Sequence, residues 1–346
     1  MMKYFQHQQA PFFFQRVGGI ALLMFAWLII ACGSGPQQLP ANAVPAFSHV
    51  FTIVLENEEY ETIIGNKQAP YFNSLVSTYA LATQYYAITH PSLPNYLALT
   101  GGDTFGLSDD CTTCFQHASN LADQIEASGR SWKAYMESMP SPCYAGNSPD
   151  GLYVQKHNPF LYYDDIRLNT RRCSSHVVPF TQLATDVADN HLPNYVWITP
   201  NMCNDMHECA LASGDSWLSQ VVPGILRSTA FTQGGVLFIT FDEGKTKAGC
   251  CSNAAGGQVA TLVISPHIKK GWRSNKPETH YSLLRTIEEM WRLPPLGNAG
   301  QSEAMTEYFT NSASSLVSVL VYQAIVSSAL LTFSLCLHHY KILIIT

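Results

Sequence analysis

Three apolar segments constrain the fold of this chain most, because each is short and is followed directly by polar residues. Residues 48–55, 192–200 and 235–241 read SHVFTIVL, LPNYVWITP and GVLFITF, with many β-branched and aromatic side chains. Such runs are typical of buried strands in a parallel sheet that helices cover on both faces. Further strands are predicted at 131–135 and 258–265. Ligands of open α/β sheets bind beyond the carboxyl ends of the strands, so the residues after each run are site candidates.

The central part of the chain is long enough for one large α/β domain with a sizeable core. The chain has 346 residues, of which 47% are hydrophobic and only 13% are charged. We expect the domain to span residues 48–310, with helices at 120–129, at 280–291 and, capped by an aspartate, at 214–225. The net charge of −6, without a Lys/Arg cluster, gives no indication of a nucleic-acid partner. We expect a monomer.

Residues 1–32 are typical of the export signal of a lipoprotein. Lys3 and Arg16 accompany an apolar run that is too short for a comfortable transmembrane helix. The run ends in LIIAC, which resembles the lipobox of bacterial lipoproteins and would make Cys32 the lipidated residue. The alternative is an uncleaved N-terminal anchor. Residues 33–47 would be a flexible tether, and both interpretations put the domain outside the cytoplasm, anchored to the cell membrane or secreted.

The C-terminal stretch 314–337 contains no charged residue and is long enough to span a bilayer. We expect a transmembrane helix here. The alternatives are a sorting sequence that is removed and a non-native extension.

Residues 86–102 (YAITHPSLPNYLALTGG) hold a serine hydroxyl rigidly at the start of a predicted helix. Pro91 and Pro94 restrict the backbone around Ser92, and Asn95 opens a helix that stops at a Gly-Gly pair. The positive end of a helix favours a phosphate or an oxyanion. The alternative is a surface turn in which Ser92 only caps the helix.

Oxygen-rich groups follow the three strands and suit a divalent cation. Asp242 and Glu243 are adjacent carboxylates at the end of a buried strand, where they would repel each other unless a cation or a proton relieves them. The alternative, an Asp N-cap with an exposed Glu, is weaker because no helical pattern follows at 245–257. A cation would lower the pKa of the Ser92 hydroxyl, so that Ser92 could attack a phosphate in line and form a phosphoseryl intermediate. The candidate metal ligands are Glu56, Asn57, Ser92, Asp205, Asp242, Glu243 and His280.

Ten cysteines indicate an oxidising compartment. The CxxC at 111–114 favours a local disulfide over zinc or thioredoxin chemistry, and the loop 203–209 has the spacing of a small disulfide ring. The expected pairs are Cys111–Cys114, Cys143–Cys173 and Cys203–Cys209, while Cys250 and Cys251 could form a vicinal pair or bridge elsewhere.

Six segments, in this order, resemble the phosphoesterase family of bacterial acid phosphatases and phospholipase-C-like enzymes, within the alkaline-phosphatase superfamily. They are FTIVLENEEYETIIGN, THPSLPNYLALTGG, KHNPF, TPNMCNDMHEC, FITFDEG and HYSLLRTIEEM, and the match spans roughly residues 48–310. The resemblance implies a three-layer α/β/α sandwich with a mostly parallel central sheet. It also implies a metal-dependent Ser or Thr nucleophile, which is Ser92 here, sharing one metal with Glu56, Asn57, Asp242 and Glu243. His157, Asp205, His207 and His280 would hold the phosphate, a second metal or the leaving-group proton.

The candidate catalytic residues are therefore Ser92, His157 and His207. The candidate phosphate or substrate contacts are Asn95, His157, Asn158 and Asn201. Compared with the two-zinc enzymes of the superfamily, a Glu-Asn stands where Asp is usual, and an Asp-Glu where Asp-His is usual. One or two ions of calcium, magnesium, manganese or zinc are thus credible.

The longer phospholipase-like relatives carry extra sequence that is missing here, which favours a small phosphomonoester as the substrate. We expect a metal-dependent phosphomonoesterase of the acid-phosphatase kind. The alternatives are a phospholipase C or phosphodiesterase of the same family, and a non-catalytic, metal-containing cell-surface protein.

Overall fold

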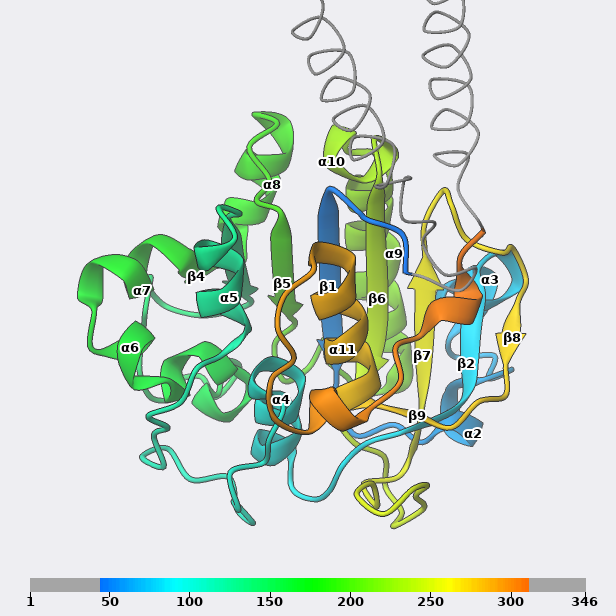
Figure 1. The fold of residues 1–346 in the computed structure, drawn as a ribbon, viewed down its shortest axis with the longest axis horizontal. Helices are drawn as coiled ribbons and strands as arrows, with labels where there is room; N and C mark the ends of the chain where they lie inside the picture. The colour runs from blue at the N-terminus through cyan, green and yellow to red at the C-terminus, as the bar shows by residue number, and fades with distance from the viewer. Residues whose placement is uncertain (1–43, 311–346) are drawn as a thin grey trace, which may run out of the picture. The chain divides into compact units, whose positions relative to one another are not determined.

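The computed structural model describes residues 44–310, in which nine strands form one sheet between two layers of helices (Figure 1). The strands are β1 (His49–Leu55), β2 (Ala80–Tyr86), β3 (Trp132–Met136), β4 (Val177–Pro179), β5 (Tyr195–Thr199), β6 (Gly235–Phe241), β7 (Gln258–Ile264), β8 (Arg273–Ser274) and β9 (Glu278–Thr279). Their order across the sheet is β4-β3-β5-β1-β6-β7-β2-β8, and β9 pairs with β2.

Paired strands run parallel except at β7, which is antiparallel to both β6 and β2. The five strands predicted from apolar runs are β1, β3, β5, β6 and β7, and all five are confirmed. Every residue of β5 and β6 is buried, as expected for central strands that helices cover on both faces. The prediction of a mostly parallel α/β/α sandwich is confirmed.

Helices lie on both faces of the sheet. Figure 1 shows α4 (Ser92–Gly101) and α11 (His280–Trp291), which pack together, in front of the sheet, and α9 (Leu211–Arg227), which packs on α3 (Pro70–Thr78), behind it. The remaining α-helices are α2 (Tyr60–Ile63), α5 (Leu121–Ala127), α6 (Asp164–Arg167), α7 (Thr170–His176), α8 (Thr181–Ala188) and α10 (Thr229–Thr232). Short 3-10 helices are η1 (Gln155–His157), η2 (Pro159–Tyr162), η3 (Gly297–Gln301) and η4 (Thr306–Tyr308).

Two predicted helix starts are wrong. Helix α4 begins at Ser92 and not at Asn95, because Pro94 falls in the first turn, where a helix does not need the missing N–H. Helix α9 begins at Leu211, so Asp215 lies inside it. The Asp215 carboxylate instead accepts hydrogen bonds from the backbone of the neighbouring α3, at Tyr71 N (3.0 Å) and Phe72 N (2.7 Å). It caps another helix and not its own.

Residues just before the predicted boundary at residue 48 pack against the core. Val44 and Phe47 are buried in the core, the Phe47 ring lies 5.3 Å from that of Phe309, and the Phe47 carbonyl accepts from the Trp291 indole (2.7 Å). The predicted signal segment 1–32, most of the tether and the stretch 314–337 lie outside the described residues. Between residues 44 and 310, no helix has the length and apolarity needed to cross a membrane.

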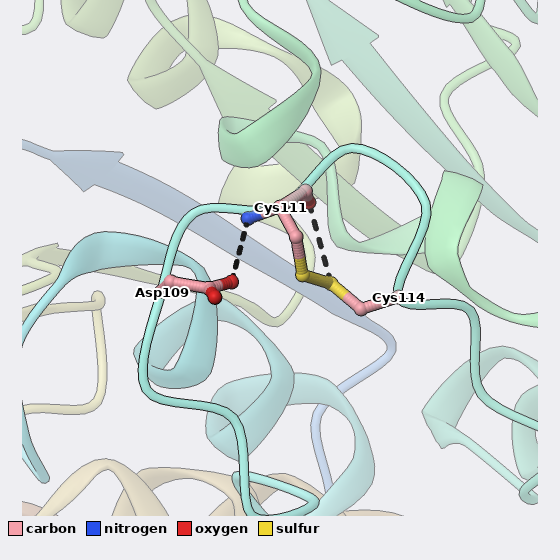
Figure 2. Close-up of side chains that lie close together, drawn as sticks. All are labelled: Asp109, Cys111 and Cys114. Carbon is pink, nitrogen blue, oxygen red and sulfur yellow. Dashed lines mark hydrogen bonds between the residues drawn. A yellow bond between two sulfur atoms is a disulfide. The ribbon is translucent and has the colours of Figure 1, made fainter.

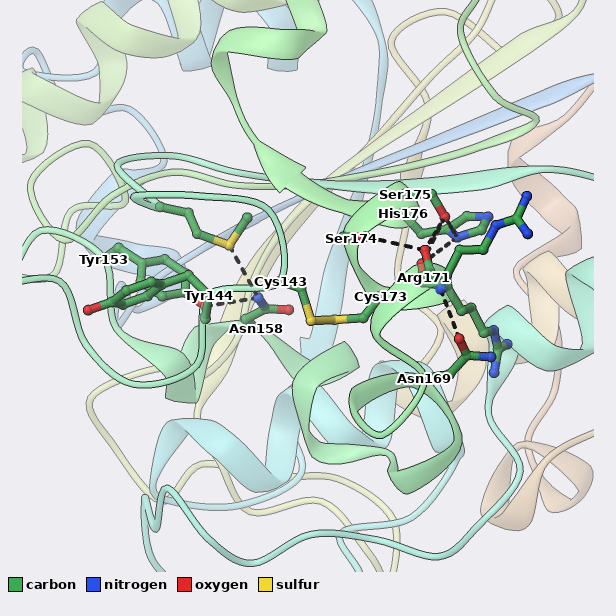
Figure 3. The surroundings of a disulfide bond; sticks show 12 residues. Cys143, Tyr144, Tyr153, Asn158, Asn169, Arg171, Cys173, Ser174, Ser175 and His176 are labelled. Carbon is green, nitrogen blue, oxygen red and sulfur yellow. Dashed lines mark hydrogen bonds between the residues drawn. A yellow bond between two sulfur atoms is a disulfide. The ribbon is translucent and has the colours of Figure 1, made fainter.

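Four disulfides are present in the described part of the chain. Cys111–Cys114, Cys143–Cys173 and Cys203–Cys209 confirm the predicted pairs, and Cys250–Cys251 form a vicinal pair. Figure 3 shows the second of these bonds, which joins the loop after β3 to α7.

Candidate active site

The site lies at the carboxyl ends of three neighbouring strands, β5, β1 and β6. Glu56 follows β1 directly, Asp242 follows β6 directly, and Asp205 lies in the loop after β5. Backbone hydrogen bonds join these strand ends, from Glu56 N to Asp205 O (2.8 Å) and from Asp242 N to Leu55 O (2.9 Å). The sheet therefore brings together three carboxylates that are far apart in the sequence.

Ser92, the first residue of α4, points its hydroxyl at Glu56. Ser92 is 1% exposed, and its Oγ donates to Glu56 Oε2 at 3.2 Å. Tyr96, one turn further along α4, donates its hydroxyl to the other carboxylate oxygen, Glu56 Oε1. Helix α4 thus supplies two hydroxyls to one buried carboxylate.

His157, from η1, lies between two buried carboxylates. Its Nε2 is 3.2 Å from Glu56 Oε2, and its Nδ1 is 3.4 Å from Asp205 Oδ2. The Tyr96 ring stacks on the imidazole with a centroid separation of 5.4 Å. Burial lowers the pKa of His157 and so favours a neutral ring, whereas Asp205 opposes this shift.

Asp242 and Glu243 meet Asn57 on the other side of the site. Asp242 Oδ1 accepts from Asn57 N (3.2 Å) and Glu243 N (2.6 Å). Asn57 has φ of 54°, in the left-handed region that Asn tolerates better than most residues. Glu243 Oε2 lies 2.8 Å from Nδ1 of His90, a residue that the sequence does not place among the ligands.

Burial and mutual repulsion disfavour the state in which all four carboxylates of this cluster are ionised. Burial raises the pKa of Glu56 to about 8 and that of Asp205 to about 7. Burial, followed by the neighbouring Asp242, raises the pKa of Glu243 to about 8. Burial and Glu56 raise the pKa of Asp242 well above its ordinary value. Either protons or a cation must neutralise these carboxylates.

The donor set fits a divalent cation. Ligand atoms of Glu56, His157 and Asp205 all lie within 4.8 Å of one another. Within residues 44–310, Asp205 Oδ2, Asp242 Oδ2 and His157 Nε2 are buried without a hydrogen-bond partner, although buried polar atoms are normally paired. Carboxylate oxygens with one imidazole suit Mg²⁺, Mn²⁺, Ca²⁺ or Zn²⁺.

Asp109, Cys111 and Cys114 form a second cluster of potential ligand atoms (Figure 2). It is not a metal site, because both sulfurs are in the disulfide and Asp109 accepts a hydrogen bond from Cys111 N (3.1 Å). The adjacent Asp110 reaches the start of α4. Its Oδ1 accepts from Leu93 N (3.0 Å), and its Oδ2 lies 2.9 Å from Lys156 Nζ.

Two of the predicted substrate contacts, Asn158 and Asn201, make hydrogen bonds within the protein. Asn158 donates to the Tyr153 hydroxyl (2.9 Å) and approaches a methionine sulfur beside the Cys143–Cys173 bond (Figure 3). Asn201 holds the loop before Asp205, accepting from Cys203 N (3.1 Å) and Asn204 N (2.9 Å). The Asn201 amide oxygen is thus taken by the loop backbone, whereas the buried Asn158 Oδ1 has no hydrogen-bond partner among the described residues. Both residues stay predictions as substrate contacts.

Asn95 lies beside the site but its amide is fully used. It accepts from Ile88 N (2.9 Å) and Thr89 N (3.1 Å), and it donates to Thr89 O (2.8 Å) and Pro91 O (3.1 Å). It therefore fastens the turn that presents Ser92.

The two remaining histidines, His280 and His207, differ in their burial and in their contacts. His280 bonds Asp242 O (2.5 Å) through Nε2 and the Tyr85 hydroxyl (3.1 Å) through Nδ1, so both ring nitrogens are engaged and it positions Asp242 instead of presenting a free ligand atom. Burial lowers its pKa to about 4. His207 is half-buried, its ring lies 5.9 Å from that of His157, and its Nδ1 is 2.9 Å from Glu208.

Sequence reasoning missed Tyr96, Lys156, Asp110 and Glu59. Tyr96 could have been found, since residues four apart share one face of a helix and Ser92 is four residues before it. Glu59 anchors the loop after Glu243 by accepting from Lys245 N (2.7 Å), Thr246 N (3.1 Å) and Gln258 N (2.9 Å). No local pattern marks Glu59 or Asp110.

Comparison with known proteins decides the family. The sequence profile of the phosphoesterase family matches residues 65–294. The chain belongs to the phosphoesterase family. This family member is 32% identical over 293 residues to a phosphatidylinositol-3-phosphatase of Mycobacterium tuberculosis, a match that covers 83% of the chain and 90% of the relative. It is therefore a phosphoester hydrolase.

A second relative is an acid phosphatase of Aspergillus fumigatus, 33% identical over 262 residues, which are 73% of this phosphoesterase. The chain spans only 56% of that fungal enzyme. Among solved structures, a protein of the alkaline phosphatase superfamily from Vibrio parahaemolyticus has a TM-score of 0.50 at 11% identity, over 79% of this chain and 75% of the other. This likeness shows a shared fold.

Proposed function

We propose that this phosphoesterase is a metal-dependent phosphomonoesterase with Ser92 as its nucleophile. The observation that carries the proposal is the buried Ser92 hydroxyl, which sits at the positive end of α4 and donates to Glu56 Oε2 at 3.2 Å. A cluster of carboxylates with unpaired oxygens surrounds it. A capped surface turn would explain neither the burial nor the cluster.

Glu56, Asp205, Asp242 and Glu243 would hold the cation, with Asn57 and His157 beside them. A divalent cation there would lower the pKa of the Ser92 hydroxyl and neutralise charge on the phosphoryl oxygens. Ser92 Oγ attacks phosphorus, the bond from phosphorus to the leaving oxygen breaks, and the hydroxyl proton passes along the existing hydrogen bond to Glu56.

We assign the proton for the leaving oxygen to His207. It is a half-buried imidazole that reaches solvent, and it lies beside the fully buried His157. His157 is a positioning residue in this scheme, because its two nitrogens lie against Glu56 and Asp205. Water then attacks the phosphoserine and gives a proton to His207, while the bond from phosphorus to Ser92 Oγ breaks. The proton held by Glu56 returns to Ser92 Oγ, so that phosphate leaves and both groups are restored.

Two substrate classes share this chemistry. A small phosphomonoester is our first candidate, and the acid-phosphatase relative agrees with it. A phosphorylated inositol lipid is the second, because the relative with 90% coverage is named a phosphatidylinositol-3-phosphatase. Turnover of p-nitrophenyl phosphate, its diester and vesicles with phosphatidylinositol 3-phosphate separates the two candidates from a phosphodiesterase or phospholipase C.

The first test is Ser92→Ala. We expect a loss of about 10³-fold or more in kcat with p-nitrophenyl phosphate, since the bond-forming oxygen is gone. Acid-quenched wild type should carry phosphate on Ser92, which mass spectrometry detects. Ser228→Ala is the control: this buried serine caps α10 at the opposite end of the sheet, so its loss should lower stability and spare kcat. An active Ser92→Ala variant would disprove the nucleophile.

Metal dependence is tested by chelation. Removing divalent cations should abolish turnover, and one of the four candidate cations should restore it. Asp242→Asn should reduce kcat about 10²-fold or more, because Asp242 is central to the cluster. Full activity after exhaustive chelation would exclude the metal assignment.

We also propose that the domain works outside the cytoplasm, attached by its N-terminal lipid or secreted. The four disulfides support this, since such bonds persist in oxidising compartments. Cell fractionation with a Cys32→Ala variant tests the anchor: the variant should leave the membrane fraction unless the C-terminal stretch retains it.

A further inference from the structure

Two hydrogen-bond donors at the edge of the site share a single carboxylate. Leu93 N, the backbone amide that follows Ser92, bonds Asp110 Oδ1 at 3.0 Å. Lys156 Nζ, from the residue before His157, bonds Asp110 Oδ2 at 2.9 Å. The donors therefore come from the segments that carry Ser92 and His157, and their spacing matches two oxygens of one small anion.

A phosphoryl group offers oxygens at a comparable spacing. The Leu93 amide belongs to the first turn of α4, whose free N–H groups favour anions. The Lys156 ammonium adds a full positive charge, and charge-assisted hydrogen bonds are about twice as strong as neutral ones. The pair is next to the Ser92 hydroxyl and therefore next to the phosphorus that Ser92 would attack.

The charge of Lys156 acts on the site itself. Burial raises the pKa of Glu56, and the Lys156 ammonium opposes that rise. Burial lowers the pKa of His207, and Lys156 lowers it further. The Lys156 side chain is also 20% exposed, so an anion from solvent can reach it.

We propose that Lys156 and the Leu93 amide bind the substrate phosphoryl group, and that the Asp110 carboxylate occupies this position when no substrate is bound. The inference deepens the proposed phosphomonoesterase function and rests on it. Asp110 lies next to Cys111 of the Cys111–Cys114 disulfide, which closes a short turn directly after it. Substrate displaces the carboxylate, and product release allows it to return.

Inorganic phosphate is the probe, because its binding needs no turnover. Calorimetry on the metal-loaded enzyme should show phosphate binding about 10- to 100-fold weaker in Lys156→Met than in wild type, the loss typical of one charged hydrogen bond. The KM for p-nitrophenyl phosphate should rise similarly. Lys133→Met is the matched control: Lys133 is also 20% exposed and paired with a carboxylate, at 2.7 Å from Asp186, but it lies at the start of β3. It should bind phosphate like wild type.

Asp110→Asn tests the second half of the proposal. Asn keeps an acceptor for Leu93 N but loses the negative charge that competes for Lys156, so phosphate should bind about three- to tenfold more tightly. Weaker phosphate binding in this variant would mean that Asp110 positions Lys156 and does not occupy the phosphoryl position, and that part of the proposal would be wrong.

The outcomes separate this inference from the proposed function. If the enzyme hydrolyses phosphomonoesters but Lys156→Met binds phosphate with wild-type affinity, the assignment of Lys156 fails and the function stands. If phosphate binds in a Lys156-dependent manner but no phosphomonoester is hydrolysed, the anion site stands and the proposed function fails.

Discussion

Glu56 is the side chain on which the rest of the site converges. It accepts from Ser92 and Tyr96, and it lies 3.2 Å from His157 Nε2. Each partner comes from a different part of the chain or a different turn of α4. Because both carboxylate oxygens are held, a cation would meet a ligand whose orientation is already set.

Tyr96 gives the sharpest test of this arrangement. In Tyr96→Phe the ring can still stack on His157, but Glu56 loses a donor that fixes its orientation. We expect metal affinity and kcat to fall about 10- to 100-fold, the usual effect of removing an outer partner of a ligand. Metal titration and steady-state kinetics measure both.

Tyr163→Phe is the control for Tyr96→Phe. Tyr163 is also buried and also bonds α4, but through Thr100 Oγ1 (2.9 Å) and not through Glu56. It should lose stability and retain metal affinity. Equal losses of metal affinity in the two variants would mean that α4 packing, and not the Glu56 contact, is responsible.

Glu288 predicts a pH dependence of stability that is separate from the active site. It is fully buried in α11, and burial raises its pKa to about 7 although Leu296 N donates to it. The folded state therefore keeps a proton that the unfolded chain releases near its ordinary pKa, so the free energy of unfolding falls as pH rises from about 4.5 to 7. This fall in the free energy of unfolding should be about 1–3 kcal/mol smaller in Glu288→Gln than in wild type. Denaturant unfolding at pH 5 and pH 8 measures the change in the free energy of unfolding for both proteins. An equal change in wild type and Glu288→Gln would contradict the prediction.

At the scale of elements, the apolar strands near the centre of the sheet were predictable, whereas β2, β4, β8 and β9 were not. The runs that became β1, β5 and β6 are mostly apolar, because helices cover both faces. β8 and β9 have two residues each, too few for any periodicity, and they exist only because β2 offers an edge. The antiparallel direction of β7 is likewise set by chain connections and not by its composition.

Asp215 illustrates why helix starts were harder. An Asp after a Gly is a good N-cap in isolation, and the sequence predicts Asp215 as one. In the fold, α9 begins four residues earlier, and Asp215 serves the free N–H groups of α3 across the interface. A capping residue thus satisfies whichever helix end the tertiary structure brings to it.

Helix α9 also controls the loop that carries Asp205. A Cβ on Gly214 would lie 2.5 Å from Met206 Cγ and 2.8 Å from Asn204 O, so Gly214→Ala must push this loop away. Asp205 lies between those two residues, and we expect the variant to lose about tenfold or more in kcat and in metal affinity. The measurements are steady-state kinetics and metal titration.

Gly224→Ala is the control in the same helix. Apart from its two chain neighbours and the adjacent backbone of its own helix, no atom of the described residues lies within 4 Å of the added Cβ. The change should therefore raise stability by up to about 1 kcal/mol and leave kcat unchanged. If Gly214→Ala behaved like Gly224→Ala, the packing of α9 would not determine the position of Asp205.

At the scale of the whole molecule, the site joins segments that are close only in the fold. Glu56 and Asp242 could be predicted because each follows an apolar strand, and Ser92 because it stands between prolines at a helix start. Asp110 and Lys156 could not, since their contacts depend on how the loops after α4 and β3 pack. Asn158 and Asn201 show the same limit: the hydrogen bonds that their amides make inside the protein follow from the fold and not from a sequence pattern.

The carboxylate cluster couples metal binding to the stability of the whole domain. Without a cation, the folded protein keeps protons on Glu56, Glu243 and Asp205 up to about pH 7–8, whereas the unfolded chain releases them near their ordinary values. The chelated protein should therefore lose stability as pH rises toward 8, and a bound cation should remove this loss because it replaces the protons.

Metal at 100 times its Kd adds about 2.7 kcal/mol to the free energy of unfolding, or roughly 5–10 °C in Tm. We expect the Tm difference between loaded and chelated protein to be larger at pH 9 than at pH 6. Buried acids elsewhere, such as Glu288, contribute equally to both forms and cancel. If chelation did not change the Tm at pH 9, protons or internal hydrogen bonds, and not a cation, would neutralise the cluster.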